Sequence, residues 1–463
     1  MTRPPATALS LPRDNTDGAA PGSSDHPTPP AGTTSAHPLR KAITSSFLGN
    51  FVEWFDYALY GYLSATIATV FFPEDEGRTA LVKTFGLFAL SFLIRPVGAV
   101  VWGHIGDRLG RKTALSWSIL LMSGATTCIA LLPGHATIGV AAPVLLLTFR
   151  LIQGFSAAGE YAGASTLLTE LAPTGKRGLV AAVVPASTAS GLLLGSLMAA
   201  LLTGVLDDAA MESWGWRIPF LIAAPLGLVG LVIRRSLDES AAFTDAVAQA
   251  ARANEEAGPG KAHRPLREVF REPRALGIAF AAAVLNAIGF YVILSYMPTY
   301  LSEELGQDDT DAFIAASVAL FAYIFSVLLT GWMSDRIGRR KIMLTASFAF
   351  VVAAVPGFLL LDGAGLALVI VIQIIMGMVL ALNDGVLPAF LAEQFSTGVR
   401  LTGFAVTFNT ANAVFGGTAP MIATLLIGWT GLTVAPAFYL MAAALVTFLA
   451  VLKAAETHRA ALS

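Results

Sequence analysis

Two acidic residues three positions apart lie in a segment that is otherwise apolar and long enough to cross a bilayer. The segment is GNFVEWFDYALYGYLSATIATVFF, residues 49–72, and the acids are Glu53 and Asp56. A charge at the bilayer centre costs at least ~2.5–3.5 kcal/mol, so such residues are candidates for function. With Tyr57 and Tyr60 they form one face of the predicted helix. If the helix begins near position 45, Asp56 lies ~16 Å deep, close to mid-membrane.

This acidic face has two interpretations. A carboxylate withdrawn from water takes up a proton more readily than one in solution, so it can bind and release protons near neutral pH. A proton-coupled transporter needs such a group beside its central passage. The alternative is a structural ion pair between one of the acids and another helix. Both interpretations hold if the acid pairs with an arginine that is displaced during transport.

Two arginines also lie in apolar stretches. Arg95, in FLIRPVG, carries a guanidinium that stays charged at physiological pH and fits a carboxylate. It either binds a carboxylate of a substrate or pairs with Glu53 or Asp56. Arg150 precedes Glu160 by ten residues, which on one continuous helix places them about 80° apart around the axis and ~15 Å apart along it. We therefore expect each to find its partner on another helix.

The second half of the chain has fewer ionisable residues in its apolar runs. Its polar positions are Asn286, Asn383, Asp384, Asn409 and Asn412, and its aromatic ones include Tyr291, Tyr296, Trp332, Phe404 and Phe408. Aromatic faces attract a quaternary ammonium group by cation–π interaction. Most aromatic side chains in membrane helices nevertheless serve packing. Asp384 is either structural or a second ionisable group in transport.

The elements that carry these residues are those of a polytopic membrane protein. Of 463 residues, 55% are hydrophobic and 13% charged, whereas a soluble domain is about a quarter charged. The net charge of −2 gives no basic field for a nucleic-acid partner. A single cysteine excludes a disulfide within the chain, and the six histidines lack metal-ligand spacing. We predict no cofactor and no metal.

Apolar runs of roughly 20 residues, the length of a membrane helix, recur along the chain. Continuous runs favour helices, because the strands of a barrel would alternate in shorter segments. The predicted fold is therefore an all-α membrane protein with twelve transmembrane helices. The expected spans are 45–71, 80–103, 113–132, 141–170, 179–205, 216–236, 275–301, 311–333, 342–361, 365–393, 401–428 and 431–452.

A charged stretch separates the first six spans from the last six. The N-terminal residues are rich in Pro, Thr, Ser, Gly and Ala and lack the apolar run of a signal peptide. We predict a disordered tail at 1–39, a six-helix bundle at 40–236, a cytoplasmic linker at 237–273, a second six-helix bundle at 274–453 and a short tail at 454–463.

The loop charges predict the orientation. With both termini in the cytoplasm, 24 of the 29 basic residues fall inside and three fall outside, as the positive-inside rule requires. We expect a multi-pass protein of the bacterial plasma membrane.

A loop motif occurs twice. GHIGDRLGRK at 103–112 follows the second span, and GWMSDRIGRRK at 331–341 follows the eighth, 228 residues later. This indicates a duplicated six-helix unit. Glycines permit close helix approach, and an aspartate can cap a helix N-terminus or pair with an arginine. We predict a cytoplasmic gate formed by Gly103, Asp107, Arg108, Gly110, Arg111, Gly331, Asp335, Arg336, Gly338 and Arg339. The alternative, a charged topology anchor, leaves the aspartates and glycines unexplained.

The duplicated Gly-x3-Asp-Arg-x-Gly-Arg loop resembles the signature of the major facilitator superfamily, whose members have two repeated halves and a site at the midplane. Other stretches resemble its metabolite:H+ symporter branch: GNFVEWFDYALYGYLS (49–64), FLIRPVGAVVWGHIGDRLGRK (92–112), RLIQGFSAAGEYAGAS (150–165), WGWRIPFLIAAPLG (214–227) and RRSLDESAAF (234–243). YVILSYMPTYLSEEL (291–305) and GEYAGAS (159–165) look most like bacterial proline/betaine transporters.

The resemblance implies two six-helix halves around a central cavity, and it associates Arg150 with proton coupling. The residues predicted for proton coupling are Glu53, Asp56, Arg150 and Glu160. The residues predicted for substrate binding are Tyr57, Tyr60, Arg95, Asn286, Tyr291, Tyr296 and Asn409.

The expected function is proton symport that imports a small zwitterion such as proline or glycine betaine by alternating access, by a monomer and without enzyme activity. The alternative is symport of a carboxylate metabolite, namely a dicarboxylate, citrate, 2-oxoglutarate or shikimate. A membrane enzyme or a sensor is disfavoured, because catalytic motifs and a signalling domain are lacking. The osmosensing relatives carry a long C-terminal coiled coil. This chain stops about ten residues after its last span, so we do not expect osmotic activation by that device.

Overall fold

The computed structural model describes residues 36–75, 77–98, 101–102, 111–236, 268–396, 399–460 and 462, and the secondary structure within these ranges is helical, without a strand. The predicted tail at 1–39 and linker at 237–273 therefore lie almost entirely outside the described residues. The first helix begins at Ala36, a few positions before the predicted boundary.

Each predicted span of the first half corresponds to helix in the structure, and several spans are built from two or three helical segments. The elements are α1 (Ala36–Tyr62), α2 (Ser64–Phe71), α3 (Gly77–Leu93), α5 (Arg111–Ala130), α6 (His135–Ile138), α7 (Ala141–Ser156), α8 (Glu160–Leu171), α9 (Arg177–Ala181), α10 (Val183–Val205), α11 (Asp208–Ala210), the π-helical η1 (Met211–Gly215) and α12 (Arg217–Ser236).

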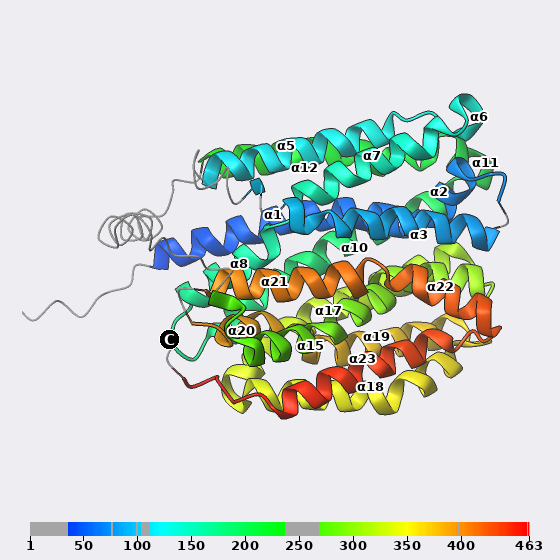
Figure 1. Ribbon diagram of the computed structural model, residues 1–463. Helices are drawn as coiled ribbons and strands as arrows, with labels where there is room; N and C mark the ends of the chain where they lie inside the picture. Colours follow the sequence, from blue (N-terminus) through cyan, green and yellow to red (C-terminus); the bar gives the residue numbers. More distant parts are fainter. Residues whose placement is uncertain are drawn as a thin grey trace, which may run out of the picture. The chain divides into compact units, whose positions relative to one another are not determined.

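The second half repeats this arrangement. Its elements are α15 (Pro273–Gly289), η2 (Phe290–Tyr296), α16 (Met297–Thr299), η3 (Tyr300–Glu304), α17 (Asp309–Ile337), α18 (Arg339–Leu361), α19 (Leu366–Asp384), α20 (Leu387–Glu393), α21 (Arg400–Ala411), η4 (Asn412–Gly416), α22 (Ala419–Thr430) and α23 (Ala435–Leu452). In Figure 1 the long helices run side by side in one direction, with the first half above and the second half below.

Within the described ranges, nine helical runs are long and apolar enough to cross a membrane. The three predicted spans outside this group are those of α1–α2, α5 and α12. The first of them carries the two acids that prompted the functional hypothesis.

The side surface of the molecule exposes many large hydrophobic side chains, among them Phe321, Phe348 and Leu449. Such a surface suits a helical protein whose sides face lipid.

Two of the predicted continuous helices are interrupted. The helix expected over 141–170 stops at Ser156 and resumes at Glu160, so the angle calculated between Arg150 and Glu160 does not apply. The corresponding helix of the second half, α19, stops at Asp384, which is 228 residues after Ser156, and resumes as α20. The duplication read from the loops therefore extends to the position at which a helix breaks.

The two halves contact each other along α10 and α17 and along α3 and α22.

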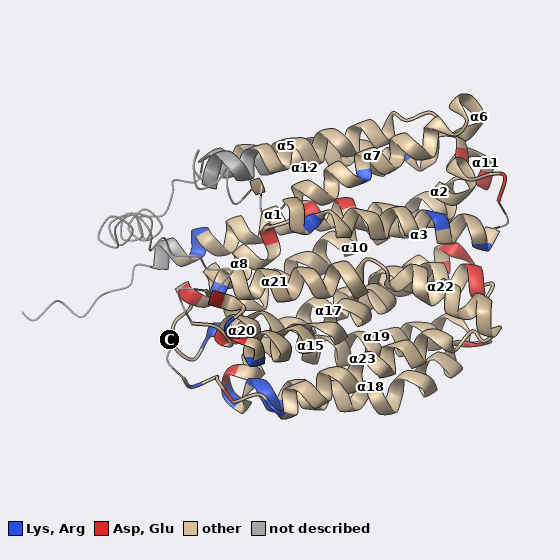
Figure 2. Ribbon diagram, viewed as in Figure 1, with Lys and Arg blue, Asp and Glu red and all other residues tan. Residues whose placement is uncertain are grey.

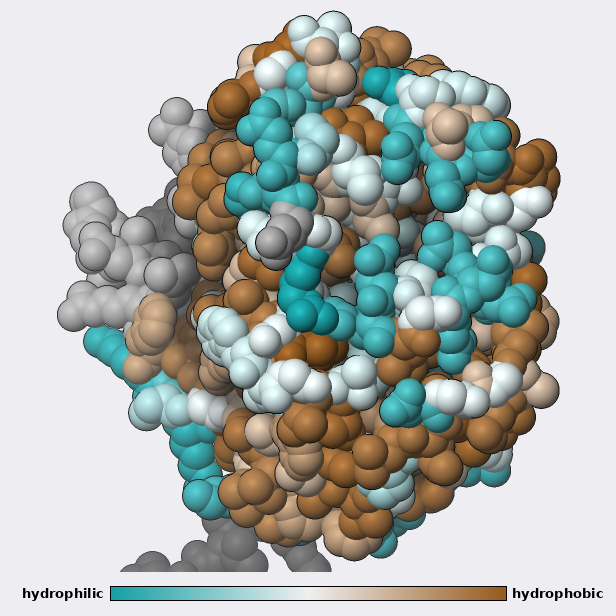
Figure 3. Space-filling model, turned by 90° about the vertical axis from the view of Figure 1, so that its right-hand side faces the viewer, coloured by the Kyte–Doolittle hydropathy of each residue, from teal (hydrophilic) through white to brown (hydrophobic). Residues whose placement is uncertain are grey.

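The end of the bundle that carries residues 331–341 is called the motif end. The opposite end, which carries residues 72–75 and 305–308, is called the far end. Figure 3 looks onto the far end: hydrophilic residues gather over the middle and upper part of this face, and hydrophobic residues surround its lower and lateral edges.

Candidate functional site

The carboxylate of Asp56 is buried, 2% exposed, and is held by two side chains from other helices. Thr126 of α5 donates through its hydroxyl to Oδ1 at 2.7 Å, and Gln153 of α7 donates through Nε2 to Oδ2 at 2.7 Å. Gln153 also donates to the Thr126 hydroxyl oxygen at 2.8 Å. Both carboxylate oxygens are therefore satisfied by neutral donors, as a buried carboxylate requires.

Arg150 is connected to Asp56 through this same glutamine. Its Nη1 donates to Oε1 of Gln153 at 2.9 Å, and its Nη2 donates to the hydroxyl of Ser91 at 3.3 Å. The guanidinium lies over the ring of Tyr60, 4.2 Å from the centroid, and is fully buried. The side chain of one glutamine thus joins a buried acid to a buried base that do not touch each other.

Glu53 and Arg95 form an ion pair one helical turn from Asp56. Nη2 of Arg95 lies 3.5 Å from Oε1 of Glu53, at the long end of the hydrogen-bond range. The two side chains are 2% and 5% exposed. Within the described residues, Arg95 therefore pairs with Glu53 and not with Asp56. Its other predicted role, binding a carboxylate of a substrate, stays a prediction.

Aromatic rings from both halves line this ion pair. The guanidinium of Arg95 lies 4.6 Å from the ring centroid of Tyr57 and 4.2 Å from that of Phe92. Tyr291, from the second half, packs edge-on against Phe92 at 5.4 Å, and its ring lies 6.1 Å from that of Trp54. The Tyr291 hydroxyl is buried and has no hydrogen-bond partner in the part of the chain that the structure describes.

The structure brings together Glu53, Tyr57, Arg95 and Tyr291, and it places other predicted residues elsewhere. Asn286 hydrogen-bonds Asp384. The Tyr296 hydroxyl accepts from Thr424 at 3.1 Å, and Asn409 donates to the carbonyl of Ala158 at 3.3 Å. Tyr60 donates to the carbonyl of Thr84 at 2.9 Å, and Glu160 is half-buried at the first residue of α8.

Sequence reasoning did not single out Thr126, Gln153, Ser91 or Trp54. Gln153 lies within RLIQG, three positions after Arg150, and an uncharged amide in an apolar run gives a weak signal. The i, i+3 spacing from an arginine on a helix is the feature that could have identified it.

The second copy of the loop motif closes the motif end. Oδ1 and Oδ2 of Asp335 accept from the backbone N–H groups of Gly178 and Leu179, at 2.8 and 3.0 Å. These groups begin the helix α9–α10 of the first half, where a negative charge is stabilising. A Cβ added at Gly178 would overlap the carbonyl oxygen of Gly331, so the contact needs glycine.

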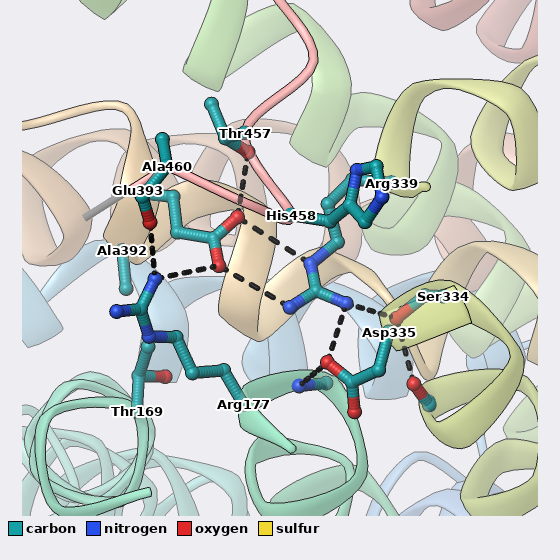
Figure 4. A network of polar contacts seen from close by, with 12 residues as sticks. Thr169, Arg177, Ser334, Asp335, Arg339, Ala392, Glu393, Thr457, His458 and Ala460 are labelled. Atoms are coloured by element: carbon teal, nitrogen blue, oxygen red, sulfur yellow. Dashed lines mark hydrogen bonds and ion pairs between the residues drawn. The ribbon is translucent and has the colours of Figure 1, made fainter. Parts of the chain in front are cut away.

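Arginines extend this contact (Figure 4). Arg339 pairs with Asp335 at 2.9 Å and with Glu393 at 3.2 Å, and Arg177 of the first half lies 3.9 Å from the same glutamate. Arg336 instead stacks on Trp332 at 3.9 Å. Four predicted gate residues of the first copy, Gly103, Asp107, Arg108 and Gly110, lie outside the described residues, as does the side chain of Arg111.

The segment after α23 joins this network. Glu456 accepts from the backbone N–H groups of Arg339 and Arg340 at 2.8 and 3.1 Å, beside Gly338, whose φ of 114° suits glycine. Arg177 donates to the carbonyl of Ala460 at 2.8 Å. The C-terminal segment therefore contacts both halves.

The far end is closed by a separate set of contacts between the halves. Arg78 pairs with Glu304 at 2.7 Å, and Tyr62 donates to the carbonyl of Leu294 at 2.7 Å. Ser317 donates to Ser196 at 2.9 Å along α17 and α10. The central charged cluster thus lies between two ends at which first-half and second-half helices touch.

Comparison with known proteins gives one sequence family and one fold. The model of the family described as "Sugar (and other) transporter" matches residues 41–463. The proline/betaine transporter of Escherichia coli (strain K12) is 35% identical over 411 residues, which cover 88% of this chain and 82% of the relative.

The solved structures support the same fold. The proton:xylose symporter XylE bound to 6-bromo-6-deoxy-D-glucose superposes with a TM-score of 0.72 and 17% identity, covering 92% of this chain and 98% of that one. A crystal structure of a D-xylose-proton symporter gives a TM-score of 0.69 at 16% identity, covering 89% and 96%.

Proposed function

The chain belongs to the sugar (and other) transporter family of the major facilitator superfamily, and we propose that it is a proton-coupled symporter that imports a small zwitterion, such as proline or glycine betaine, by alternating access. Members of this family are transporters and not enzymes, and the chain is a multi-pass membrane protein.

The observation that carries the substrate class is the Glu53–Arg95 pair within an aromatic wall. The pair presents one negative and one positive charge, so it complements a ligand that carries both. The carboxylate of such a ligand fits the guanidinium of Arg95, and its ammonium group fits Glu53 and the faces of Tyr57 and Trp54. The two charges of the ligand would compensate those of Glu53 and Arg95 when the pair, 3.5 Å apart, separates.

A carboxylate metabolite is a poorer match for the same cluster. A dicarboxylate or citrate would bring at least two negative charges to one guanidinium and would approach the buried Glu53. Leaving a buried charge without compensation is strongly unfavourable. A betaine has no such excess charge, and the name of the Escherichia coli relative supports this choice.

Proton coupling is assigned to Asp56. Its two donors are neutral, and Arg150 reaches it only through Gln153. Protonation removes the charge that holds Thr126 and Gln153 on the carboxylate, and therefore loosens the connection of α1 to α5 and α7. A group that joins three helices in one protonation state and releases them in the other can link proton binding to helix movement.

We assign the motif end to the cytoplasm and propose two moving units, residues 40–236 and 274–453. Figure 2 supports the orientation, because the lysines and arginines concentrate at the motif end, as the positive-inside rule requires. The proposed cycle alternately breaks the Asp335–Gly178 contacts and the Arg78–Glu304 and Ser196–Ser317 contacts. The central cluster is built within one chain, which supports function as a monomer.

The test is uptake of radiolabelled glycine betaine and proline into proteoliposomes that contain the purified full-length protein. We expect accumulation when the outside is acidic, and none when the pH gradient is collapsed by a protonophore. A parallel panel contains succinate, citrate, 2-oxoglutarate and shikimate. Accumulation of a panel member without uptake of either zwitterion would overturn the substrate assignment. Uptake that ignores the pH gradient would overturn the proton coupling.

A further inference from the structure

A second buried carboxylate lies in the other half of the molecule, in a place to which the proposed mechanism assigns no role. Asp384 is the last residue of α19, 228 residues after the residue that ends α7, and its side chain is fully buried. The helix break that follows packs tightly: a Cβ added at Gly385 would overlap the carbonyl oxygen of Val327. The backbone that follows the carboxylate is therefore packed closely against α17.

The hydrogen-bond donors to this carboxylate within the described ranges are neutral. The hydroxyl of Tyr323 donates to Oδ2 at 2.7 Å, and Nδ2 of Asn383 donates to Oδ1 at 3.1 Å. The side chain of Asn286, from α15, hydrogen-bonds it as well. The ion pairs formed within the described ranges do not include Asp384. The ionisable side chain of Tyr161, from α8, also interacts electrostatically with Asp384.

Among the residues that the structure describes, no cation pairs with this carboxylate. An ionised carboxylate buried without a cation is costly even when hydrogen-bonded, and in a membrane protein such a group faces a partner or an aqueous path. The neighbouring amide of Asn383 is also incompletely satisfied, because its Oδ1 is buried and has no hydrogen-bond donor in the described structure. A half-turn of that amide would place its oxygen where its nitrogen now lies, as the acceptor for a proton on Asp384.

We propose that Asp384 is a second proton-binding site of the transporter, loaded and emptied once in each transport cycle. This inference rests on the proposed function for its role in the cycle, but not for proton binding itself. On loading, an O–H bond forms at a carboxylate oxygen and a hydronium ion becomes water. On release, the proton passes to water and the carboxylate returns to the donors Tyr323 and Asn383.

The position of Asp384 supplies a release route. Tyr161, from the first half, stacks on Phe408 of the second half with ring centroids 4.4 Å apart and planes 4° apart. Opening of the motif end separates these two rings, because they belong to opposite halves. Water entering there would then approach Asp384 past Tyr161, which lies close enough to this carboxylate to interact with it electrostatically. Asp56 and Asp384 therefore give each half one carboxylate that can carry a proton.

The first experiment does not depend on the substrate. Infrared difference spectra of the full-length protein in lipid, recorded across the pH range in which carboxylates and histidines titrate, report the carbonyl stretch of protonated acids. We expect Asp384→Asn to remove one titrating band that Asp56→Asn retains. The exposed acid Asp362 supplies the matched control, Asp362→Asn, which should keep that band. Wild-type and Asp384→Asn spectra with the same titrating bands would overturn the proposal.

A second variant separates proton binding from a structural role. Tyr323→Phe keeps the ring but removes one donor from the ionised carboxylate, and a hydrogen bond to a charged group is worth roughly tenfold or more in an equilibrium. The band assigned to Asp384 should then persist to higher pH by about one unit. A band in Tyr323→Phe that titrates as in the wild type would contradict the proposal. A band that responds to sodium ions but not to pH would identify a metal-cation site instead.

The last arm measures coupling. In proteoliposomes, the substrate gradient that just balances an imposed pH gradient gives the number of protons moved with each glycine betaine. We expect one proton fewer for Asp384→Asn than for the wild type, and an unchanged number for Asp362→Asn. An unchanged number in Asp384→Asn overturns the second site. Absence of proton-driven uptake in the wild type overturns the proposed function, and the infrared result then stands by itself.

Discussion

At the scale of single residues, the centre of the protein contains two charged pairs that are built differently. Glu53 and Arg95 touch, whereas Asp56 and Arg150 communicate through Gln153. A direct pair neutralises charge in place. An indirect pair leaves the acid with neutral donors, so its proton can change without a cation moving first. The predictions for the two acids differ accordingly.

Asp56→Asn should abolish accumulation of substrate against its gradient while leaving the protein in the membrane. The amide can still accept from Thr126, so the fold is retained, but it cannot take a proton. Uptake into proteoliposomes should stop when the internal substrate concentration equals the external one. Exchange of internal for external substrate should continue. Glu74→Gln, an exposed acid near the far end, is the control and should accumulate like the wild type. Undiminished accumulation by Asp56→Asn would remove this residue from the coupling role.

Glu53→Gln and Arg95→Gln should each destabilise the protein, and the double variant should be more stable than either. Removing one member of a buried pair leaves an uncompensated charge, at a cost of about 3–5 kcal/mol, and removing both avoids it. Thermal unfolding in detergent measures the double-mutant cycle. Simply additive losses would mean that the two charges do not interact.

At the scale of elements, closure of the motif end depends on one glycine-to-glycine contact. Gly178 at the start of α9 and Gly331 in α17 approach so closely that neither admits a side chain, and Asp335 holds the pair by accepting from the backbone of α9. In the second copy of the loop motif, Gly331 is therefore explained by helix contact, and Asp335 by a cap on a helix of the other half.

Gly178→Val should prevent closure of the motif end. The added carbons would meet the backbone of Gly331, which cannot move aside as a flexible side chain could. We expect a protein that inserts normally, loses most of its transport, and labels readily at a cysteine introduced at Asn409, in a Cys128→Ser background. Gly163→Ala is the matched control, since a Cβ there meets no atom within 4 Å. Wild-type transport by Gly178→Val would exclude this contact as a gate.

The C-terminal segment should detach in acid. Glu456 is partly buried, which raises its pKa, but the backbone N–H groups of Arg339, His458 and Arg340 lower the pKa more, and the net shift is below its ordinary value of 4.5. A lowered pKa means that docking is fully stabilised above pH 4.5 and is lost as the pH falls through the lower, docked value. A spin label at Arg459→Cys should gain mobility only below pH 4.5.

Two variants check this assignment to Glu456. Glu456→Gln should show a mobile label already at neutral pH, because a neutral amide is a weaker acceptor for the N-terminus of α18. His458→Gln should keep the acid transition. A transition that persists in Glu456→Gln would point to another group.

At the scale of the whole molecule, contacts between the halves exist at both ends at once. An alternating-access cycle then requires that either set can break while the other remains. The longest shared surface runs along α10 and α17, from Thr203 and Thr310 near the far end to Gly178 and Gly331 at the motif end. Rocking of the halves would open this surface at one end while the contacts at its other end stay closed.

Locking the far end should stop transport reversibly. Ser196 and Ser317 lie on α10 and α17 with their hydroxyl oxygens 2.9 Å apart. We expect the double variant Ser196→Cys, Ser317→Cys, in a Cys128→Ser background, to form a crosslink on oxidation and to lose uptake. A reducing agent should restore it, and each single variant should be unaffected by the oxidant. Full transport by the crosslinked protein would show that this interface does not open.

The sequence by itself determined the number and positions of the spans, the duplication, and the two acids in the first span. Those properties are local, because membrane insertion depends on the composition of each segment and the gate motif is contained in one loop. The sequence also singled out Glu53, Asp56, Arg95 and Arg150, which the structure brings together, and Glu160, which lies at the first residue of α8. Their roles in transport stay predictions.

Only the tertiary structure decided which of these residues meet. Arg95 lies on Glu53, Arg150 reaches Asp56 through Gln153, and Asn286 belongs to Asp384. These pairings depend on how each helix is rotated about its axis and where it is broken, as at Ser156 and Asp384. The hydropathy pattern says little about how each helix is rotated about its axis, because the helices contact both lipid and protein. The partner of each charged or polar side chain is therefore decided by packing across the whole chain.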